Sequence, residues 1–134
     1  MELAAAIKKA KRVYLVGNGG SFANASHIAN DLQNCGIKAH SMDPAILTAW
    51  ANDFGYETVF EKWIDVHGEP GDLLIALSGS GTSKNILNAI DKAKSKGMDY
   101  RLVTWYLTAL DMQDSEEHQL ALGHQAMREL RASK

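Results

Sequence analysis

The sequence is poor in cysteine, in proline and in net charge: it has one cysteine, two prolines and a formal charge of −2 in 134 residues. A single cysteine, Cys35, excludes an intramolecular disulfide and fits a reducing compartment. There is no run of basic residues, so electrostatics give no reason to expect a nucleic-acid partner. No apolar run approaches the ~18 residues of a membrane span, and the N-terminal residues lack the apolar core of a signal peptide. These absences predict a cytoplasmic protein without a nucleic-acid or membrane partner.

What remains is the composition of an ordinary globular domain. Hydrophobic residues make up 46% of the chain and charged residues 22%, which is typical of such domains. A chain of this size buries roughly two-thirds of the surface that it exposes when unfolded, which is enough for a core. We therefore expect a single domain over residues 1–134.

Short apolar runs alternate with amphipathic segments along the whole chain. We expect helices over 2–11, 21–34, 44–50, 56–66, 82–96 and 115–131, and strands over 13–16, 37–40, 73–77 and 101–106. Ser115 is the expected N-cap of the last helix. Because strands alternate with helices, the pattern predicts a three-layer α/β fold, a doubly wound parallel sheet of about four strands covered on both faces.

Two of the expected strands end in similar glycine-rich turns. Gly17-Asn18-Gly19-Gly20-Ser21 follows the first strand, and Ser78-Gly79-Ser80-Gly81-Thr82 follows the third. Glycine leaves backbone N–H groups open to a ligand, and a helix N-terminus adds unpaired donors and partial positive charge. Turns of this kind bind anions, most often phosphate. The alternative is that both are only tight turns. The occurrence of two similar turns in one chain makes this alternative less favoured than a single turn would.

Neither turn fits a nucleotide-binding pattern. The dinucleotide fingerprint needs a third glycine where Phe22 and Lys84 stand, and no Gly-Lys-Ser/Thr sequence of a P-loop occurs. The turns therefore predict a sugar phosphate as ligand and no nucleotide cofactor.

With these turns, the chain resembles the sugar isomerase (SIS) fold, and within it the phosphoheptose isomerases, which interconvert sedoheptulose 7-phosphate and a heptose 7-phosphate. The resemblance lies in four stretches: VGNGGSFANASHIANDL, LTAWANDFGYETVFEKWI, GDLLIALSGSGTSKNILNAI and MQDSEEHQLALGH. It implies that Ser78, Ser80 and Ser83 hold the phosphate. It also implies that the sugar is bound by four residues: Asn18, Gly19, Ser21 and Asp53.

The same resemblance implies a possible zinc site and an acid–base pair. His27 and Asp31 are four residues apart and so share a helical face, and the family pattern adds Glu116 and His124 as further ligands. All four are acceptable zinc ligands on chemical grounds. For the transfer of a proton through an enediol, we expect Asp31 as base and His124 as acid, with the two roles open to exchange. The alternatives are that His27 packs between helices, that His124 is merely exposed, and that Glu117 lies nearer the face of His124 than Glu116 does.

The chain also departs from the family pattern in three ways. A long first helix is missing, the segment YLTAL between Trp105 and Asp111 replaces a loop and a strand, and Asp31 stands where the family has Glu. The departures predict a reduced member of the family, in which a neighbouring copy completes the site. The leading hypothesis is a sugar-phosphate ketose–aldose isomerase. The alternative is a non-catalytic module that binds sugar phosphates or a protein partner.

The aromatic residues bear on assembly. Trp50, Phe54, Phe60 and Trp63 are expected to lie in the core or in a subunit interface, because a small sheet has little surface to cover them. We expect a homo-oligomer, a dimer or a tetramer, with the face of Phe60 and Trp63 buried against another copy.

Overall fold

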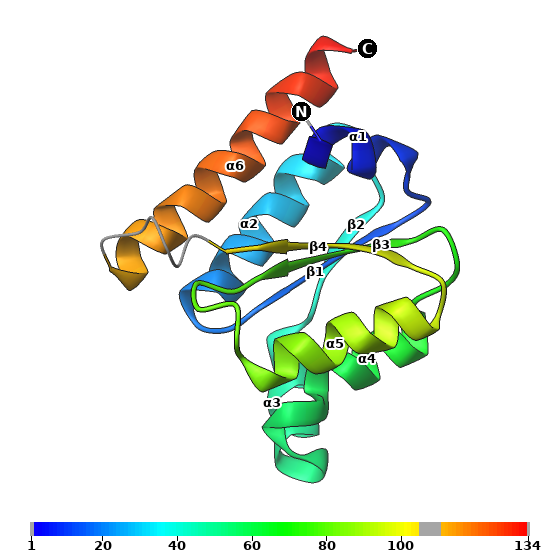
Figure 1. The fold of residues 1–134 in the computed structure, drawn as a ribbon, viewed down its shortest axis with the longest axis vertical. Helices are drawn as coiled ribbons and strands as arrows, with labels where there is room; N and C mark the ends of the chain where they lie inside the picture. Colours follow the sequence, from blue (N-terminus) through cyan, green and yellow to red (C-terminus); the bar gives the residue numbers. More distant parts are fainter. Residues whose placement is uncertain (1, 105–110, 134) are drawn as a thin grey trace.

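The computed structural model describes residues 2–104 and 111–133, which form helices around one sheet (Figure 1). The elements in chain order are α1 (Glu2–Lys9), β1 (Val13–Gly17), α2 (Gly20–Gln33), β2 (Ala39–Ser41), α3 (Pro44–Phe54), the 3₁₀ turn η1 (Tyr56–Thr58), α4 (Val59–His67), β3 (Leu73–Leu77), α5 (Lys84–Ser95), β4 (Asp99–Val103) and α6 (Met112–Ala132). The strands run parallel in the order β2-β1-β3-β4. The predicted α/β fold with a parallel four-stranded sheet is confirmed.

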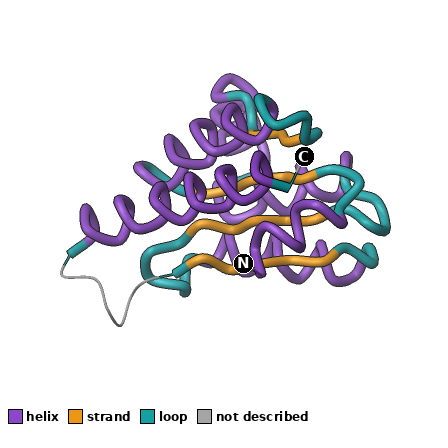
Figure 2. Tube along the Cα trace, turned by 90° about the horizontal axis from the view of Figure 1, so that it is seen from above, coloured by secondary structure: helices purple, strands orange, loops and turns teal. Residues whose placement is uncertain are grey.

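Each face of the sheet is covered by its own layer of helices. On β1, Val13 and Leu15 point into the core under α1, α2 and α6, whereas Tyr14 and Val16 point into the core with α4 and α5. In Figure 1 the first layer lies above the sheet and the second below it. Figure 2 shows the strands side by side, seen from the side of α6. The two central strands, β1 and β3, are wholly buried because helices cover both faces, whereas the edge strands β2 and β4 are partly exposed.

The two glycine-rich turns lie next to each other because their strands are neighbours. β1 pairs with β3 in parallel, and Gly17 lies opposite Leu77 at the carboxyl end of both strands. From this edge the chain enters α2 on one face of the sheet and α5 on the other. This is a topological switch point, the usual ligand-binding position in an open α/β sheet.

Several predicted element bounds are wrong. α6 begins at Met112, and its N-cap is Asp111, whose carboxylate accepts a hydrogen bond from the Asp114 N–H at 2.8 Å. Ser115 therefore lies inside the helix. β4 ends at Val103; the end of the predicted strand at Trp105 and Tyr106, with the YLTAL segment, lies outside the described residues. No helix in the described part is long and apolar enough to cross a membrane.

The prediction that Phe60 and Trp63 face another copy is also wrong. Trp63 is only 5% exposed and Phe60 is fully buried, because α4 presses both into the core beneath the sheet. An exposed apolar surface lies on α3, where no residue is buried although most are apolar. α3 begins at Pro44, directly after its N-cap Asp43. At the other end of this helix, Phe54 is 53% exposed.

Candidate functional site at the switch point and on two helices

The second glycine-rich turn, residues 78–83, is shaped by its own hydroxyl groups. The Gly81 N–H donates to Ser78 Oγ at 3.1 Å, and the Thr82 N–H donates to Ser80 Oγ at 3.2 Å. Gly81 has a φ of +72°, a conformation that favours glycine. Ser78 is buried and supports the turn from inside, whereas Ser80 and Ser83 are partly exposed.

The turn ends at the N-terminus of α5. Ser83 is the N-cap of α5, and its side chain makes no capping hydrogen bond. The hydroxyl of Ser83 and the first N–H groups of α5 are therefore available to an anion. This geometry suits a phosphate group.

The first glycine-rich turn, residues 17–21, offers a different surface. Gly19 has a φ of +56° and no other atom within 4 Å of the position of a Cβ, so its backbone is open to a ligand. The side chain of Asn18 exchanges two hydrogen bonds with Asn85, each of 2.9 Å, and accepts a third from the Tyr56 hydroxyl at 2.6 Å. The amide pair joins the first turn to the first helical turn of α5.

Two of the expected sugar-binding residues make hydrogen bonds within the chain. Ser21 is buried beneath α6, and its hydroxyl accepts a hydrogen bond of 3.0 Å from Gln119 Nε2. Asp53 is exposed near the end of α3 and accepts a hydrogen bond from its neighbour Asn52. Their contact with a sugar stays a prediction.

Asn85 and Tyr56 are site residues that the sequence analysis missed. Asn85 had a signal, because it is a polar residue in the first turn of a helix that opens at a suspected phosphate site. Tyr56 had none, since only the folded chain brings η1 to Asn18.

His27, Asp31 and His124 come together on the outside of α2 and α6. Asp31 Oδ2 lies 3.4 Å from His27 Nε2 and 3.3 Å from His124 Nε2, and the two imidazole nitrogens are 3.2 Å apart. Asp31 Oδ2 is buried, yet it has no hydrogen-bond partner. The shorter aspartate side chain thus still reaches both histidines. We name this group the histidine–aspartate cluster.

A cation is the chemical complement of this cluster. A buried carboxylate oxygen without a partner is unfavourable unless a positive charge or a donor meets it. The three ligand atoms lie within 4.8 Å of one another, which is a spacing that one metal ion can bridge. Two imidazoles and a carboxylate are a common ligand set for zinc with an open fourth position.

Glu116, the fourth expected ligand, is not part of this cluster. Its carboxylate lies over Gly20, at the N-terminus of α2, where a Cβ on residue 20 would collide with it. His27 is seven residues further along α2, which is about 10 Å along the helix axis. Glu116 therefore lies near the switch point and apart from the histidines, as its position two turns before His124 on α6 requires.

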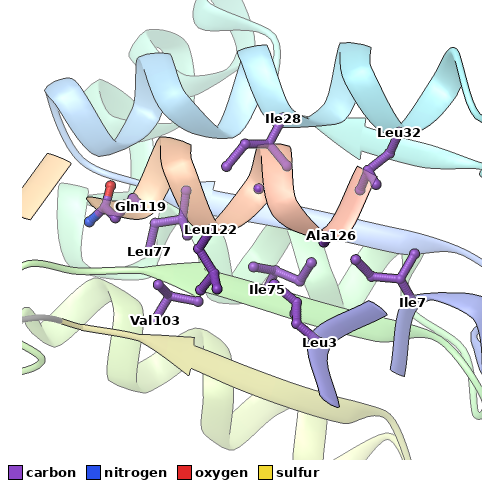
Figure 3. A pocket seen from close by; sticks show the side chains of 11 residues that line it. Leu3, Ile7, Ile28, Leu32, Ile75, Leu77, Val103, Gln119, Leu122 and Ala126 are labelled. Carbon is purple, nitrogen blue, oxygen red and sulfur yellow. The ribbon is translucent and has the colours of Figure 1, made fainter. Parts of the chain in front are cut away.

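A close contact between α2 and α6 brings the histidines together. A Cβ on Gly123 would lie 2.6 Å from Ile28 Cγ1, so only glycine permits this approach of the helices. Figure 3 shows Ile28 on α2 above α6, with Leu32 and Ala126 one turn further along. Leu122 and Gln119 of α6, with α1 and the sheet, close an apolar cavity under this contact. Its lining has one polar side chain, Gln119, so the cavity is a gap in packing and not a substrate site.

The fold and the site together define a class of protein: a doubly wound α/β domain with two glycine-rich turns at its switch point. The chain belongs to the SIS domain family, whose pattern matches residues 2–101. A phosphoheptose isomerase from Maridesulfovibrio salexigens is 43% identical over 105 residues, which are 72% of this chain and 51% of that protein. The chain spans about half the length of the curated relatives it matches.

Solved structures show the same fold. A phosphoheptose isomerase from Neisseria gonorrhoeae superposes with a TM-score of 0.87 over 97% of this chain and 81% of that chain, at 24% identity. The Vibrio vulnificus NanR protein complexed with ManNAc-6P superposes with a TM-score of 0.74 over 98% of this chain and 53% of that chain, at 18% identity. At these identities the likeness establishes the fold.

We expect Gly123→Ala to destabilise the protein and to separate His27 from His124. The added methyl group collides with Ile28, and overpacking of this kind costs about 1–3 kcal/mol, partly offset by the better helix propensity of alanine. Urea unfolding measures the loss, and the chemical shifts of the two imidazoles report their separation. Adding Ile28→Ala to Gly123→Ala should bring the imidazole shifts back toward those of the wild type. Unchanged stability and unchanged shifts in Gly123→Ala would show that the helix contact does not hold the cluster.

Proposed function

We propose that the protein is a phosphoheptose isomerase-like ketose–aldose isomerase that converts sedoheptulose 7-phosphate into a heptose 7-phosphate. The observation that carries the proposal is the histidine–aspartate cluster, in a chain that is 43% identical to a phosphoheptose isomerase over 105 residues. Aldose–ketose isomerisation moves a proton between two adjacent carbons, and it needs a base near carbon and an acid near oxygen. A carboxylate and an imidazole held 3.3 Å apart supply both groups.

The phosphate of the substrate binds to residues 78–83 in this proposal. Ser80 and Ser83 offer hydroxyl groups, and the N-terminus of α5 offers backbone donors and partial positive charge. Ser78 supports the turn from beneath through its bond to Gly81. Asn18 and the open backbone of Gly19 lie beside this turn and face the sugar.

Asp31 is the proposed base and His124 the proposed acid. The Asp31 carboxylate removes the proton from the carbon next to the carbonyl group and returns it to the neighbouring carbon. The His124 imidazole gives a proton to the carbonyl oxygen as the enediol forms, and takes one from the adjacent hydroxyl as the enediol collapses.

Zinc is the alternative occupant of the same residues, because a His124 Nε2 that holds a metal ion has no proton to give. His27 Nε2, Asp31 Oδ2 and His124 Nε2 would hold it, whereas Glu116 lies too far along the helices to join them. When bound, zinc supplies Lewis-acid polarisation of the carbonyl group. His27 then serves the reaction by holding the cluster together.

A second copy of the chain completes the site in our proposal. Residues 78–83 lie at the carboxyl edge of the sheet, where a Cβ on Gly79 would lie 3.0 Å from Ser115 Oγ near the start of α6. His124 is nine residues further along α6, about 13 Å along the helix axis, so one copy presents the phosphate turn and the cluster well apart. The apolar, unburied helix α3 is the surface that a second copy would cover.

We expect light scattering to show at least a dimer at micromolar concentration. Phe54→Glu should weaken the assembly because it places a charge on the exposed apolar face of α3. Val66→Glu, at an exposed position on α4, is the matched control and should leave the assembly unchanged.

Mixing inactive Ser80→Asp chains with inactive Asp31→Asn chains should restore part of the turnover, since a mixed pair contains one intact site. A monomeric wild-type protein would refute the assembly.

We expect Ser80→Asp to abolish binding of sedoheptulose 7-phosphate while the protein stays folded. The new carboxylate occupies the position of the phosphate and repels it. Ser95→Asp is the matched control, because Ser95 is exposed at the other end of α5. Calorimetric titration measures the affinity. Equal affinities of Ser80→Asp and the wild type would remove residues 78–83 from the site.

Asp31→Asn and His124→Gln should each lower the exchange of substrate hydrogen with deuterated solvent by about 10²–10⁴-fold, which is the usual contribution of a general acid or base. The affinity for sedoheptulose 7-phosphate should change little. Both variants should also lose bound zinc, which elemental analysis measures. The matched control is His118→Gln on α6, where the histidine lies 3.5 Å from Asp114 and not in the cluster.

The same exchange experiment separates the enzyme from the second candidate function, a module that binds sugar phosphates without chemistry. The likeness to the NanR protein complexed with ManNAc-6P favours that candidate, because the shared fold there carries a sugar phosphate. Exchange by the zinc-loaded wild type supports the enzyme. Binding of sedoheptulose 7-phosphate without any exchange supports the module.

A further inference from the structure

The side chain of Asn18 is held from two sides. Its Nδ2 donates to Asn85 Oδ1 and its Oδ1 accepts from Asn85 Nδ2, both at 2.9 Å, so the two amides form a reciprocal pair. The Tyr56 hydroxyl donates to the same Oδ1 of Asn18 at 2.6 Å. Asn18 follows β1, Asn85 lies in the first turn of α5, and Tyr56 begins η1. We call these three residues the Asn18 clamp.

The clamp decides what Asn18 can offer a ligand. A carbonyl oxygen has two lone pairs, and an amide nitrogen has two N–H groups. Both acceptor positions of Asn18 Oδ1 are used, by Asn85 and by Tyr56, whereas one N–H of Asn18 is left without an acceptor among residues 2–104 and 111–133. Asn18 therefore meets a ligand as a hydrogen-bond donor and not as an acceptor.

Further contacts hold Tyr56 at Asn18. Gly55, with a φ of +92°, ends α3 and turns the chain into η1. The Asn88 side chain donates to the Glu57 carbonyl at 3.2 Å, and the Glu57 carboxylate lies 3.3 Å from Lys84 Nζ, so η1 is fastened to α5. Tyr56 remains 47% exposed. The position of Tyr56 is therefore fixed by these contacts and by its hydrogen bond to Asn18 more than by burial of its ring.

We propose that Tyr56 and Asn85 are positioning residues, which keep the Asn18 amide turned so that its N–H points to a carbonyl or hydroxyl oxygen of a sugar phosphate. The inference deepens the proposed function and rests on it for the identity of the ligand. If the amide were free to turn over, it would present its oxygen as often as its N–H. Because Asn85 is only two residues after Ser83, the clamp also ties the donor to the turn that holds the phosphate in our proposal.

The test is Tyr56→Phe, which removes one hydroxyl group from an exposed ring and leaves the fold intact. The loss of one neutral hydrogen bond predicts an affinity for sedoheptulose 7-phosphate that is about 2- to 10-fold weaker. The affinity for inorganic phosphate, which lacks the sugar oxygens, should not change. Tyr100→Phe is the matched control, because Tyr100 lies on β4, with Lys94 over its ring. It should leave both affinities unchanged.

A double-mutant cycle shows whether Tyr56 acts through Asn18. In an Asn18→Ala background, Tyr56→Phe should have no further effect on the affinity for sedoheptulose 7-phosphate. The same loss in both backgrounds, or an equal loss for inorganic phosphate, would overturn the inference.

Side-chain NMR tests the clamp without a sugar. The two Nδ2–H signals of Asn18 should move in Tyr56→Phe and stay in place in Tyr100→Phe. If the Asn18 signals do not respond to Tyr56→Phe, the clamp is refuted, whatever the protein binds. If the wild type binds no sedoheptulose 7-phosphate, the proposed function fails and with it the ligand named here, while the NMR result still decides whether Tyr56 positions Asn18.

Discussion

The packing of α2 against α6 at Gly123 is the contact on which the chemistry of this protein depends. The two helices run in the same direction from the switch point, and Gly123 lets the backbone of α6 come within van der Waals distance of Ile28. His27 and His124 are the next residues in sequence to these two contacts. A side chain larger than hydrogen at position 123 would widen the gap between the helices, and the ring nitrogens would no longer lie 3.2 Å apart. Polar contacts of Gln119 with Ser21 and Asn24 fix the register of the same pair of helices.

A buried carboxylate at the centre of the cluster gives the arrangement its chemical meaning. Asp31 Oδ2 is removed from solvent without a hydrogen bond, an unfavourable state that most folded proteins avoid. Positive charge from a metal ion, or a proton on either imidazole, removes the penalty. The same three side chains therefore carry both the proposed metal site and the proposed acid–base pair.

The parallel pairing of β1 with β3 is the second constraint. It places both glycine-rich turns at one edge, where Asn18 of one turn exchanges hydrogen bonds with Asn85, two residues after the end of the other. The phosphate turn nevertheless lies against the start of α6 at Gly79, whereas the cluster lies between two and three turns further along the same helix. A substrate must reach both, and this separation is the structural reason to expect that a second copy takes part in the site.

Local spacing in the sequence determined most of what lies within one element or one strand–turn–helix unit, apart from element bounds such as the start of α6. The alternation of apolar runs predicted the parallel sheet, the glycine-rich turns predicted the switch point, and the four-residue spacing predicted that His27 and Asp31 share a face. Contacts between elements could not be found in this way, because they depend on the register of one helix against another. The tertiary structure alone decided that His124 joins the cluster while Glu116 lies over Gly20, that Ser21 is buried under Gln119, and that Phe60 and Trp63 pack inward. It also brought Tyr56 to Asn18, across a distance in sequence that no periodicity spans.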